Sequence, residues 1–191
     1  RREETAHPRG LWRRTTLEEY RKPQPAWETL LDLDALNAAE GENWVWHGAD
    51  YLRPDYQRCL LALSRGGADA SVTREFDLAT RTWIEDGFQL PESKGGLGWI
   101  DRDNVYVFTD FGEGTMTRSG YPRIVKQWQR GTPLSAARVV YEGRLDDMYI
   151  AAMHDDTPGH ERDLPTGRRL AAWRRGKKPS TEPALDERPD Q

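Results

Sequence analysis

Short segments of alternating hydrophobic and polar residues dominate the chain and predict strands rather than helices. Valine, isoleucine, threonine and aromatic residues fill these segments, and glycine, aspartate and proline separate them. One short helix is expected over residues 35–40, with Asp34 as its N-cap. The strands are expected at residues 11–18, 26–32, 44–51, 57–64, 70–76, 81–86, 96–100, 104–109, 122–129, 136–142 and 147–153.

A weak internal repeat groups these strands. Trp27, Trp83 and Val139 occupy equivalent places in it, and successive members lie 56 residues apart. Between the copies lie strands that are nearly all apolar, around Leu60–Leu63 and Val105–Phe108. Apolar inner strands followed by alternating outer strands suit stacked sheets, because an inner strand is buried on both faces.

The expected fold class is therefore all-β, as an incomplete β-propeller. It would contain about two four-stranded antiparallel blades, at residues 44–86 and 96–142, plus flanking strands. A β-sandwich with accidental spacing is the alternative. We expect two parts: a partial propeller domain over residues 1–163, and a basic, then acidic and proline-rich tail over residues 164–191 that is disordered.

Composition and charge narrow the class of protein. Apolar residues make up 36% of the chain and charged residues 31%, so eight tryptophans and seven tyrosines must supply much of the core. A net charge of −4, from 28 basic and 32 acidic residues, argues against a nucleic-acid binder. No apolar run is long enough for a membrane span or a signal peptide, which predicts a cytoplasmic protein.

Several local motifs contain residue types that occur in functional sites. Cys59 lies in an apolar run and is expected to be a buried, inert thiol. His154 and His160, with carboxylates between them, could hold a divalent ion, but their spacing favours an acidic turn. Gly95–Gly98 lacks the lysine of a phosphate loop and precedes a strand. The basic stretch Arg168–Lys178 could bind phosphates or act as a localisation signal, but it favours a disordered tail.

Seven segments then form an ordered series along the chain: His7–Thr15, Pro25–Asp32, Glu42–Trp46, Leu63–Asp69, Arg74–Leu78, Thr109–Gly112 and Ser119–Lys126. This series resembles the propeller of bacterial members of the prolyl oligopeptidase family, from residue 7 to about residue 163. The resemblance implies a peptidase that joins an α/β-hydrolase domain, carrying a Ser-Asp-His triad, to a seven-bladed propeller. That propeller covers the active site and admits only short peptides.

The sequence also departs from the family pattern. An apolar strand of the next blade is expected after Asp163, but Leu164–Lys178 and an acidic, proline-rich tail follow, as in a frameshift product or an unrelated extension. The family's first segment and its hydrolase domain have no counterpart in these residues.

The chemistry of an α/β-hydrolase requires a serine in the motif Gly-x-Ser-x-Gly. None of the serines has this frame, whether Ser64, Ser71, Ser93, Ser119, Ser135 or Ser180. We therefore assign no catalytic, cofactor-binding or metal-binding residue and expect the chain to be inactive alone.

The expected function is that of a non-catalytic, substrate-gating propeller fragment of a prolyl-oligopeptidase-like serine peptidase. Its partners would be the hydrolase domain and oligopeptides, without nucleic acid or membrane, and exposed blade faces should cause self-association. The alternative is a stand-alone propeller-like binding scaffold that contacts a protein or peptide partner.

Overall fold

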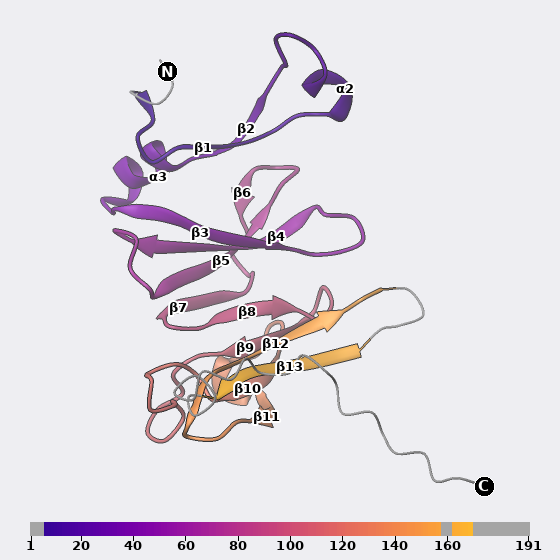
Figure 1. Cartoon of the computed structure of the whole chain (residues 1–191). Helices are drawn as coiled ribbons and strands as arrows, with labels where there is room; N and C mark the ends of the chain where they lie inside the picture. The colour runs from indigo at the N-terminus through magenta and orange to yellow at the C-terminus, as the bar shows by residue number, and fades with distance from the viewer. Residues whose placement is uncertain (1–5, 158–161, 170–191) are drawn as a thin grey trace, which may run out of the picture.

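The computed structural model describes residues 6–157 and 162–169, and its sheets are stacked in layers (Figure 1). The helical segments are α2 (Leu17–Tyr20), α3 (Leu33–Glu40) and the 3-10 helix η1 (Leu134–Ala136). The strands are β1 (Leu11–Arg14), β2 (Glu28–Asp32), β3 (Trp44–Tyr51), β4 (Arg58–Arg65), β5 (Ser71–Asp77), β6 (Thr82–Trp83), β7 (Gln89–Ser93), β8 (Gly96–Trp99), β9 (Asn104–Phe108), β10 (Ile124–Gln129), β11 (Arg138–Glu142), β12 (Asp147–Asp155) and β13 (Arg162–Arg169).

The two predicted blades are present. One sheet has the order β3-β4-β5-β6, with β7 also beside β5, and the next has the order β8-β9-β10-β11. Strands that are neighbours in the chain pair antiparallel in both. We call these sheets the first and the second blade. The expected all-β, partial propeller fold is confirmed, and the sandwich alternative is not needed.

Two-stranded sheets flank the two blades. In the 56-residue sequence repeat, the β1–β2 pair occupies the same place as the β5–β6 and β10–β11 pairs. Those pairs are the outer strands of their blades, so β1 and β2 are outer strands as well. The β12–β13 pair follows β11 in the chain, and β12 contacts β8, β9 and β10 of the second blade. The described residues thus form the outer half of one blade, two whole blades and the inner half of another.

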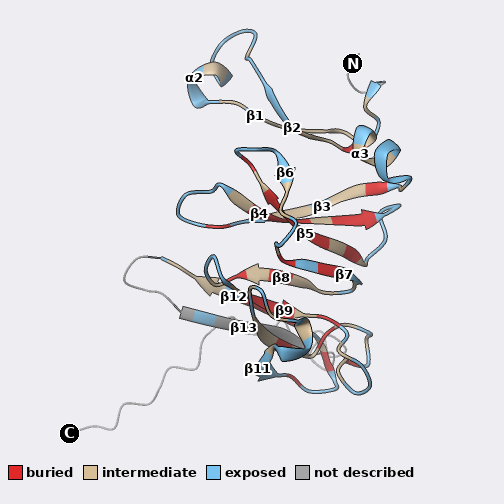
Figure 2. Ribbon diagram, turned by 180° about the vertical axis from the view of Figure 1, so that it is seen from behind, coloured by how far each residue is buried: buried red, intermediate tan, exposed pale blue. Residues whose placement is uncertain are grey.

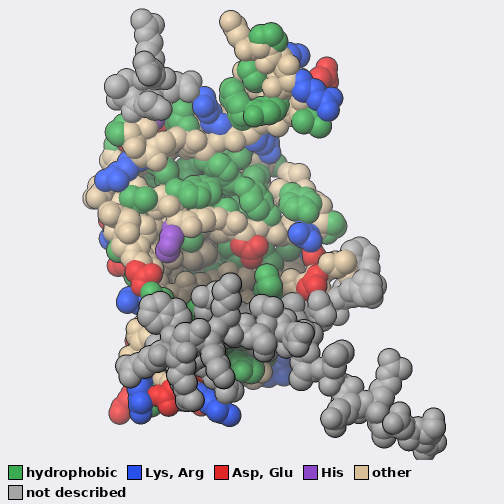
Figure 3. Space-filling model, in the orientation of Figure 1, with side chains coloured by type: hydrophobic (Ala, Val, Ile, Leu, Met, Phe, Trp, Pro, Cys, Tyr) green, Lys and Arg blue, Asp and Glu red, His purple; other side chains and the backbone are tan. Residues whose placement is uncertain are grey.

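Hydrophobic clusters fill the spaces between successive layers, and buried residues concentrate in the middle strands (Figure 2). The cluster between β1–β2 and the first blade includes Leu30, Trp44 and Phe76. Tryptophans at its margin, Trp12 and Trp46, have ring centroids 5.0 Å apart. Hydrophobic side chains gather over this first blade below the β1–β2 hairpin (Figure 3). Burial of such apolar surface is the main stabilising term of each layer contact.

The outer strand of the first blade differs from the prediction of a strand over residues 81–86. Only Thr82–Trp83 pair there as β6, and the chain then leaves the sheet edge before it returns as β7. The break lies opposite Glu75, whose carboxylate accepts a hydrogen bond from the Phe88 N–H at 2.9 Å. The β7 strand was missed because Pro91 weakens its strand signal, although an edge strand tolerates proline.

Glu75 is completely buried, and its charge is balanced by two arginines. Arg58 of the same blade lies 2.9 Å from Oε1, and Arg130, which follows β10 of the second blade, lies 2.8 Å from Oε2. A buried carboxylate needs such partners because desolvation of an isolated charge is very costly. Glu75 therefore ties the first blade to the second.

Two local predictions near the N-terminus need correction. The strand expected over residues 11–18 ends at Arg14, because Thr16 caps α2 by accepting a hydrogen bond from the Glu19 N–H. The expected helix begins at Leu33, two residues early, and its N-cap is Asp32 rather than Asp34. Asp34 instead accepts a hydrogen bond from the Arg9 N–H at 3.0 Å.

The expectation for the tail is wrong for its first six residues. Residues 164–169 belong to β13, where backbone pairing with β12 continues through Arg169 and does not require an apolar sequence. Residues 170–191 lie outside the described residues. Among the described helices, none is long and apolar enough to cross a membrane.

Candidate functional site

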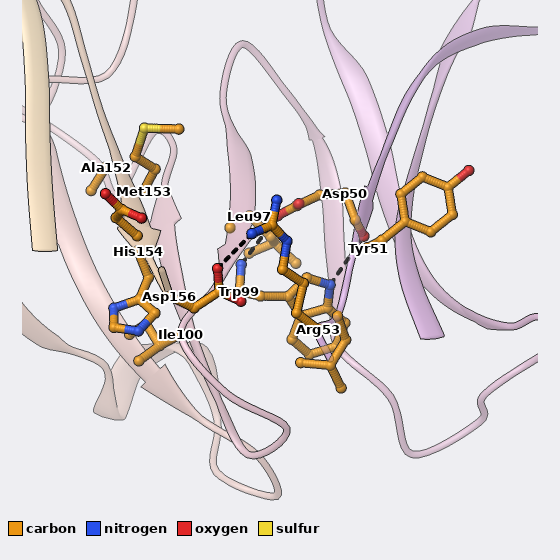
Figure 4. Close-up of a pocket in the computed structure, with 13 residues that line it drawn as sticks. Asp50, Tyr51, Arg53, Leu97, Trp99, Ile100, Ala152, Met153, His154 and Asp156 are labelled. Carbon is orange, nitrogen blue, oxygen red and sulfur yellow. Dashed lines mark hydrogen bonds and ion pairs between the residues drawn. The ribbon is translucent and has the colours of Figure 1, made fainter. Parts of the chain in front are cut away.

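A cavity lies where the first strands of three successive blades end. Its volume is about 530 Å³, and we call it the inner-strand cavity (Figure 4). Because β3, β8 and β12 each form one edge of their sheets, the cavity is bounded by three strand ends that belong to different blades. The lining residues are Asp50–Arg53, Leu97–Ile100 and Ala152–Asp156.

The wall between the first two blades is fixed by Trp99 at the end of β8. Its backbone N–H donates to Oδ2 of Asp50 at 3.2 Å, and its indole Nε1–H donates to the Asp50 carbonyl at 3.0 Å. Its ring also packs against Phe88, with centroids 5.9 Å apart. Trp99 is therefore buried by the first blade and holds the Asp50 carboxylate in place beside the cavity.

The opposite wall is joined to the first blade by an ion pair. Arg53, just beyond β3, places Nη1 2.8 Å from Oδ1 of Asp156, just beyond β12. These strands belong to sheets separated by the second blade, so the pair spans the end of that blade (Figure 4). The side chains are 55% and 35% exposed, so solvent weakens the attraction between them.

The electrostatics of Asp50 reflect its confined position. Desolvation raises the pKa of this carboxyl above its usual value, while the N–H groups of Trp99 and Tyr51 and the nearby Arg53 oppose the rise. Asp156 raises the pKa further, because a second negative charge nearby disfavours ionisation. The Arg53 guanidinium group thus pairs with Asp156 and also favours the ionised form of Asp50.

A second polar group lies between the second blade and β12–β13. His154 Nδ1 is 2.8 Å from Oδ1 of Asp163, and the Tyr106 hydroxyl also hydrogen-bonds to Asp163. The hydrogen bond from Tyr106, followed by that from His154, lowers the pKa of Asp163. Burial, together with this carboxylate, raises the pKa of Tyr106. These contacts are polar ties between β9, β12 and β13.

This arrangement suits binding rather than covalent chemistry. The cavity combines an indole ring, the apolar side chains of Ile100 and Met153, and charged groups held at fixed positions. Concave sites with apolar walls and a few convergent polar groups are typical of ligand-binding surfaces. The residues that line it include no serine, cysteine or lysine that could act as a nucleophile.

The family of the chain follows from comparison with known proteins. The model of the prolyl oligopeptidase N-terminal beta-propeller domain matches residues 1–160. The chain belongs to the prolyl oligopeptidase family. The predicted resemblance is thereby confirmed.

Relatives and solved structures agree with this membership. An uncharacterized peptidase of Sinorhizobium fredii is 45% identical over 142 residues, 74% of this chain and 20% of the relative. An uncharacterized peptidase of Rickettsia prowazekii is 31% identical over 154 residues, 76% of this chain and 21% of the relative. The chain thus spans about one fifth of the length of these two relatives.

The solved structures give the same picture of the fold. A post-proline cleaving enzyme from Rickettsia typhi has a TM-score of 0.80 and 28% identity, covering 86% of this chain and 25% of that enzyme. Oligopeptidase B from Leishmania major has a TM-score of 0.58 at 13% identity, covering 83% of this chain and 21% of that protein, and this likeness concerns the fold alone.

The candidate site residues named from the sequence have ordinary structural roles where the structure describes them. Cys59 is fully buried in β4, as expected, and burial raises the pKa of its thiol to about 12. Ser64 is buried in β4, within the strand expected over residues 57–64. Gly96–Trp99 form β8, in agreement with a strand instead of a phosphate loop.

The histidine cluster is only partly described. His154 uses Nδ1 to contact Asp163, whereas His160 and Glu161 lie outside the described residues. Arg168 and Arg169 of the basic stretch belong to β13, and its remainder also lies outside them. The first two residues of the basic stretch Arg168–Lys178 therefore belong to a strand and not to a tail.

Sequence reasoning missed two groupings. His7, Asp32 and Asp34 bring their potential metal-ligating atoms close together. Both carboxylates already accept hydrogen bonds, however: Asp32 caps α3, and Asp34 accepts from the Arg9 N–H. The inner-strand cavity was also missed, because its walls are brought together only by blade stacking. The repeat could have indicated it, since strand ends at equivalent repeat positions meet around the axis of a propeller.

Proposed function

We propose that this chain is a non-catalytic, substrate-gating part of the propeller of a prolyl-oligopeptidase-family serine peptidase. In this proposal it works beside an α/β-hydrolase domain, which supplies the catalytic triad, and limits the peptides that reach that domain. Oligopeptides would be the molecules that pass it. The same proposal places the protein in the cytoplasm, which cell fractionation would test.

The observation that carries the proposal is the convergence of three inner strands. A radial arrangement of blades would bring the ends of β3, β8 and β12 around one opening, as their shared cavity suggests. The Arg53–Asp156 pair crosses this opening at 2.8 Å. A passage bounded by packed blades admits a narrow extended chain and rejects a folded protein, because packed cores deform little.

The test is a chimera with the Sinorhizobium fredii relative, in which residues 7–157 replace the matching segment. Its activity should be measured on prolyl peptides of increasing length and on an unfolded protein with the same cleavage site. We expect the short peptides to be cleaved and the rate to fall steeply with length, as in the parent enzyme.

A matched chimera with both Arg53→Gln and Asp156→Asn tests the opening itself. Removal of the pair should raise the rate on longer peptides relative to the rate on the shortest peptide. Equal length dependence in the two chimeras and in a relative with its propeller removed would contradict the gating role. The isolated 191-residue chain should hydrolyse none of these substrates.

The proposal also includes self-association of the isolated chain. Val139, Val140 and Tyr141 of β11 are 50%, 40% and 40% exposed, and Met153 of β12 is 57% exposed. Apolar side chains on a strand that is also a sheet edge favour contact between molecules.

A further inference from the structure

The inner-strand cavity has an unequal set of charges. Among the described residues that line it are the carboxylates of Asp50 and Asp156 and one guanidinium group, that of Arg53. Arg53 is in contact with Asp156. The hydrogen bonds to Asp50 come from neutral backbone N–H groups. Asp50 and Asp156 thus place two carboxylates beside one guanidinium group, and burial makes an unbalanced negative charge more costly than it would be in open solvent.

The cavity also offers an apolar wall beside these carboxylates. Ile100 and Met153 line it together with Trp99, and the Met153 side chain is 57% exposed and adaptable in shape. A ligand that fits both features carries a compact cation next to an apolar group. A primary ammonium group at the start of a peptide, followed by its first side chain, has this form.

We propose that the inner-strand cavity binds the primary ammonium group of a short peptide, with Asp50 and Asp156 as its charge partners. This inference rests on the proposed function, which brings oligopeptides to this opening. The ammonium group would donate hydrogen bonds to the two carboxylates, and Arg53 would compete with it for Asp156. The propeller would then select peptides by charge as well as by size.

The test uses the 191-residue chain and three peptide probes. The first is a tetrapeptide amide of alanine and proline with a free amino terminus, the second is the same peptide acetylated, and the third is acetylated but contains one lysine. Binding is measured by calorimetry and by the indole N–H resonance of Trp99 in NMR spectra. We expect the free amine to bind about tenfold more tightly than its acetylated form, because one charge contact is removed.

The variants distinguish charge recognition from a structural role. Asp50→Asn and Asp156→Asn should each weaken binding of the free amine about threefold to tenfold. Arg53→Gln should strengthen it, because a competing cation is lost. Asp146→Asn is the matched control, since Asp146 lies at the other end of β12 in an exposed pair with Arg118. Circular dichroism checks that each variant is folded.

Equal binding of the free and acetylated peptides overturns the inference, and so does the lack of any binding at millimolar peptide. Weaker binding by Arg53→Gln also overturns it, because it would show a structural role for the pair. Binding of the lysine peptide as tight as that of the free amine supports an ammonium site that accepts either source. If charge preference fails while the chimera keeps its length dependence, only the present inference falls.

Discussion

The two faces of the second blade are built differently, although β9 contributes to both. Toward the first blade, Val105 and Val107 are fully buried in a cluster with Leu60, Phe88 and Leu90. Toward β12, Tyr106 joins a smaller cluster with Val125, Ile150 and Ala152. Alternate side chains of one strand thus serve a large apolar contact and a smaller one.

The polar contacts also differ between the two faces of the second blade. The first face has the completely buried Glu75 between two arginines, whereas on the second His154 and the buried Tyr106 contact Asp163, whose side chain is 63% exposed. The inner-strand cavity lies where β12 approaches β8. Removal of a buried charge partner is costly, but exposed pairs contribute little. The first face therefore holds the blades together, and the second can adapt to a ligand.

The largest expected effect is at Glu75. Glu75→Gln should lower the free energy of unfolding by about 3–5 kcal/mol, because it leaves the guanidinium groups of Arg58 and Arg130 without their buried carboxylate. Urea unfolding followed by tryptophan fluorescence measures the loss. The control is Asp103→Asn, which removes a 67% exposed partner of Arg130 and should cost less than about 0.5 kcal/mol. Equal stability of the two variants would contradict the structural role of the buried carboxylate in the first face.

A matched pair of truncations compares the apolar parts. Val107 faces the first blade and Val125 faces β12, and both are fully buried. Val107→Ala should cost about 2–3 kcal/mol and Val125→Ala about 1–2 kcal/mol, because a smaller cluster collapses more readily around the two lost methyl groups. Urea melts of both variants measure the difference. A larger cost at Val125 would show that the second face is the tighter one.

The periodicity of the sequence predicted most of this architecture. Runs such as Leu60–Leu63 and Val105–Phe108 are apolar because their strands lie inside stacked sheets, and the structure places both there. The broken outer strand was not predictable, because its cause is the buried Glu75, and a lone glutamate in a strand pattern resembles a solvent-facing residue.

The candidate site was less accessible to sequence reasoning. Asp50, Trp99 and Asp156 are far apart in the chain, and only the stacking of three blades brings them to one cavity. The β13 strand was missed for a related reason. Its pairing depends on backbone hydrogen bonds with β12, so composition alone indicated a tail.

Self-association provides a test at the outer edge of the second blade. Val140→Lys should weaken association of the isolated chain roughly tenfold, because it places a charge on the exposed apolar strand β11. Sedimentation velocity over a range of concentrations measures the shift. The control is Arg138→Lys, which keeps a charge on the same strand. A wild-type chain that stays monomeric at all concentrations would contradict the expectation.

The smallest expected effect concerns the pH dependence of the second face. The Tyr106 and His154 contacts lower the pKa of Asp163, so the ionised carboxylate stabilises the folded form above its unfolded pKa of about 3.9. This stability is lost as the pH falls through the still lower folded pKa. The raised pKa of Tyr106 acts at the other limit: its contribution is complete below about pH 10 and is lost as the pH rises further. Between these limits the tie between β9 and β13 is intact. The gain is under about 1 kcal/mol, because the Asp163 side chain is 63% exposed and solvent screens it.

Hydrogen exchange of the β12 amides, compared with those of β4 in the first blade, should show weaker protection at pH 3 than at pH 7 in β12 alone. Asp163→Asn should remove that difference. If β4 loses protection in parallel, the two faces open together, and the second is not an independent point of adaptation.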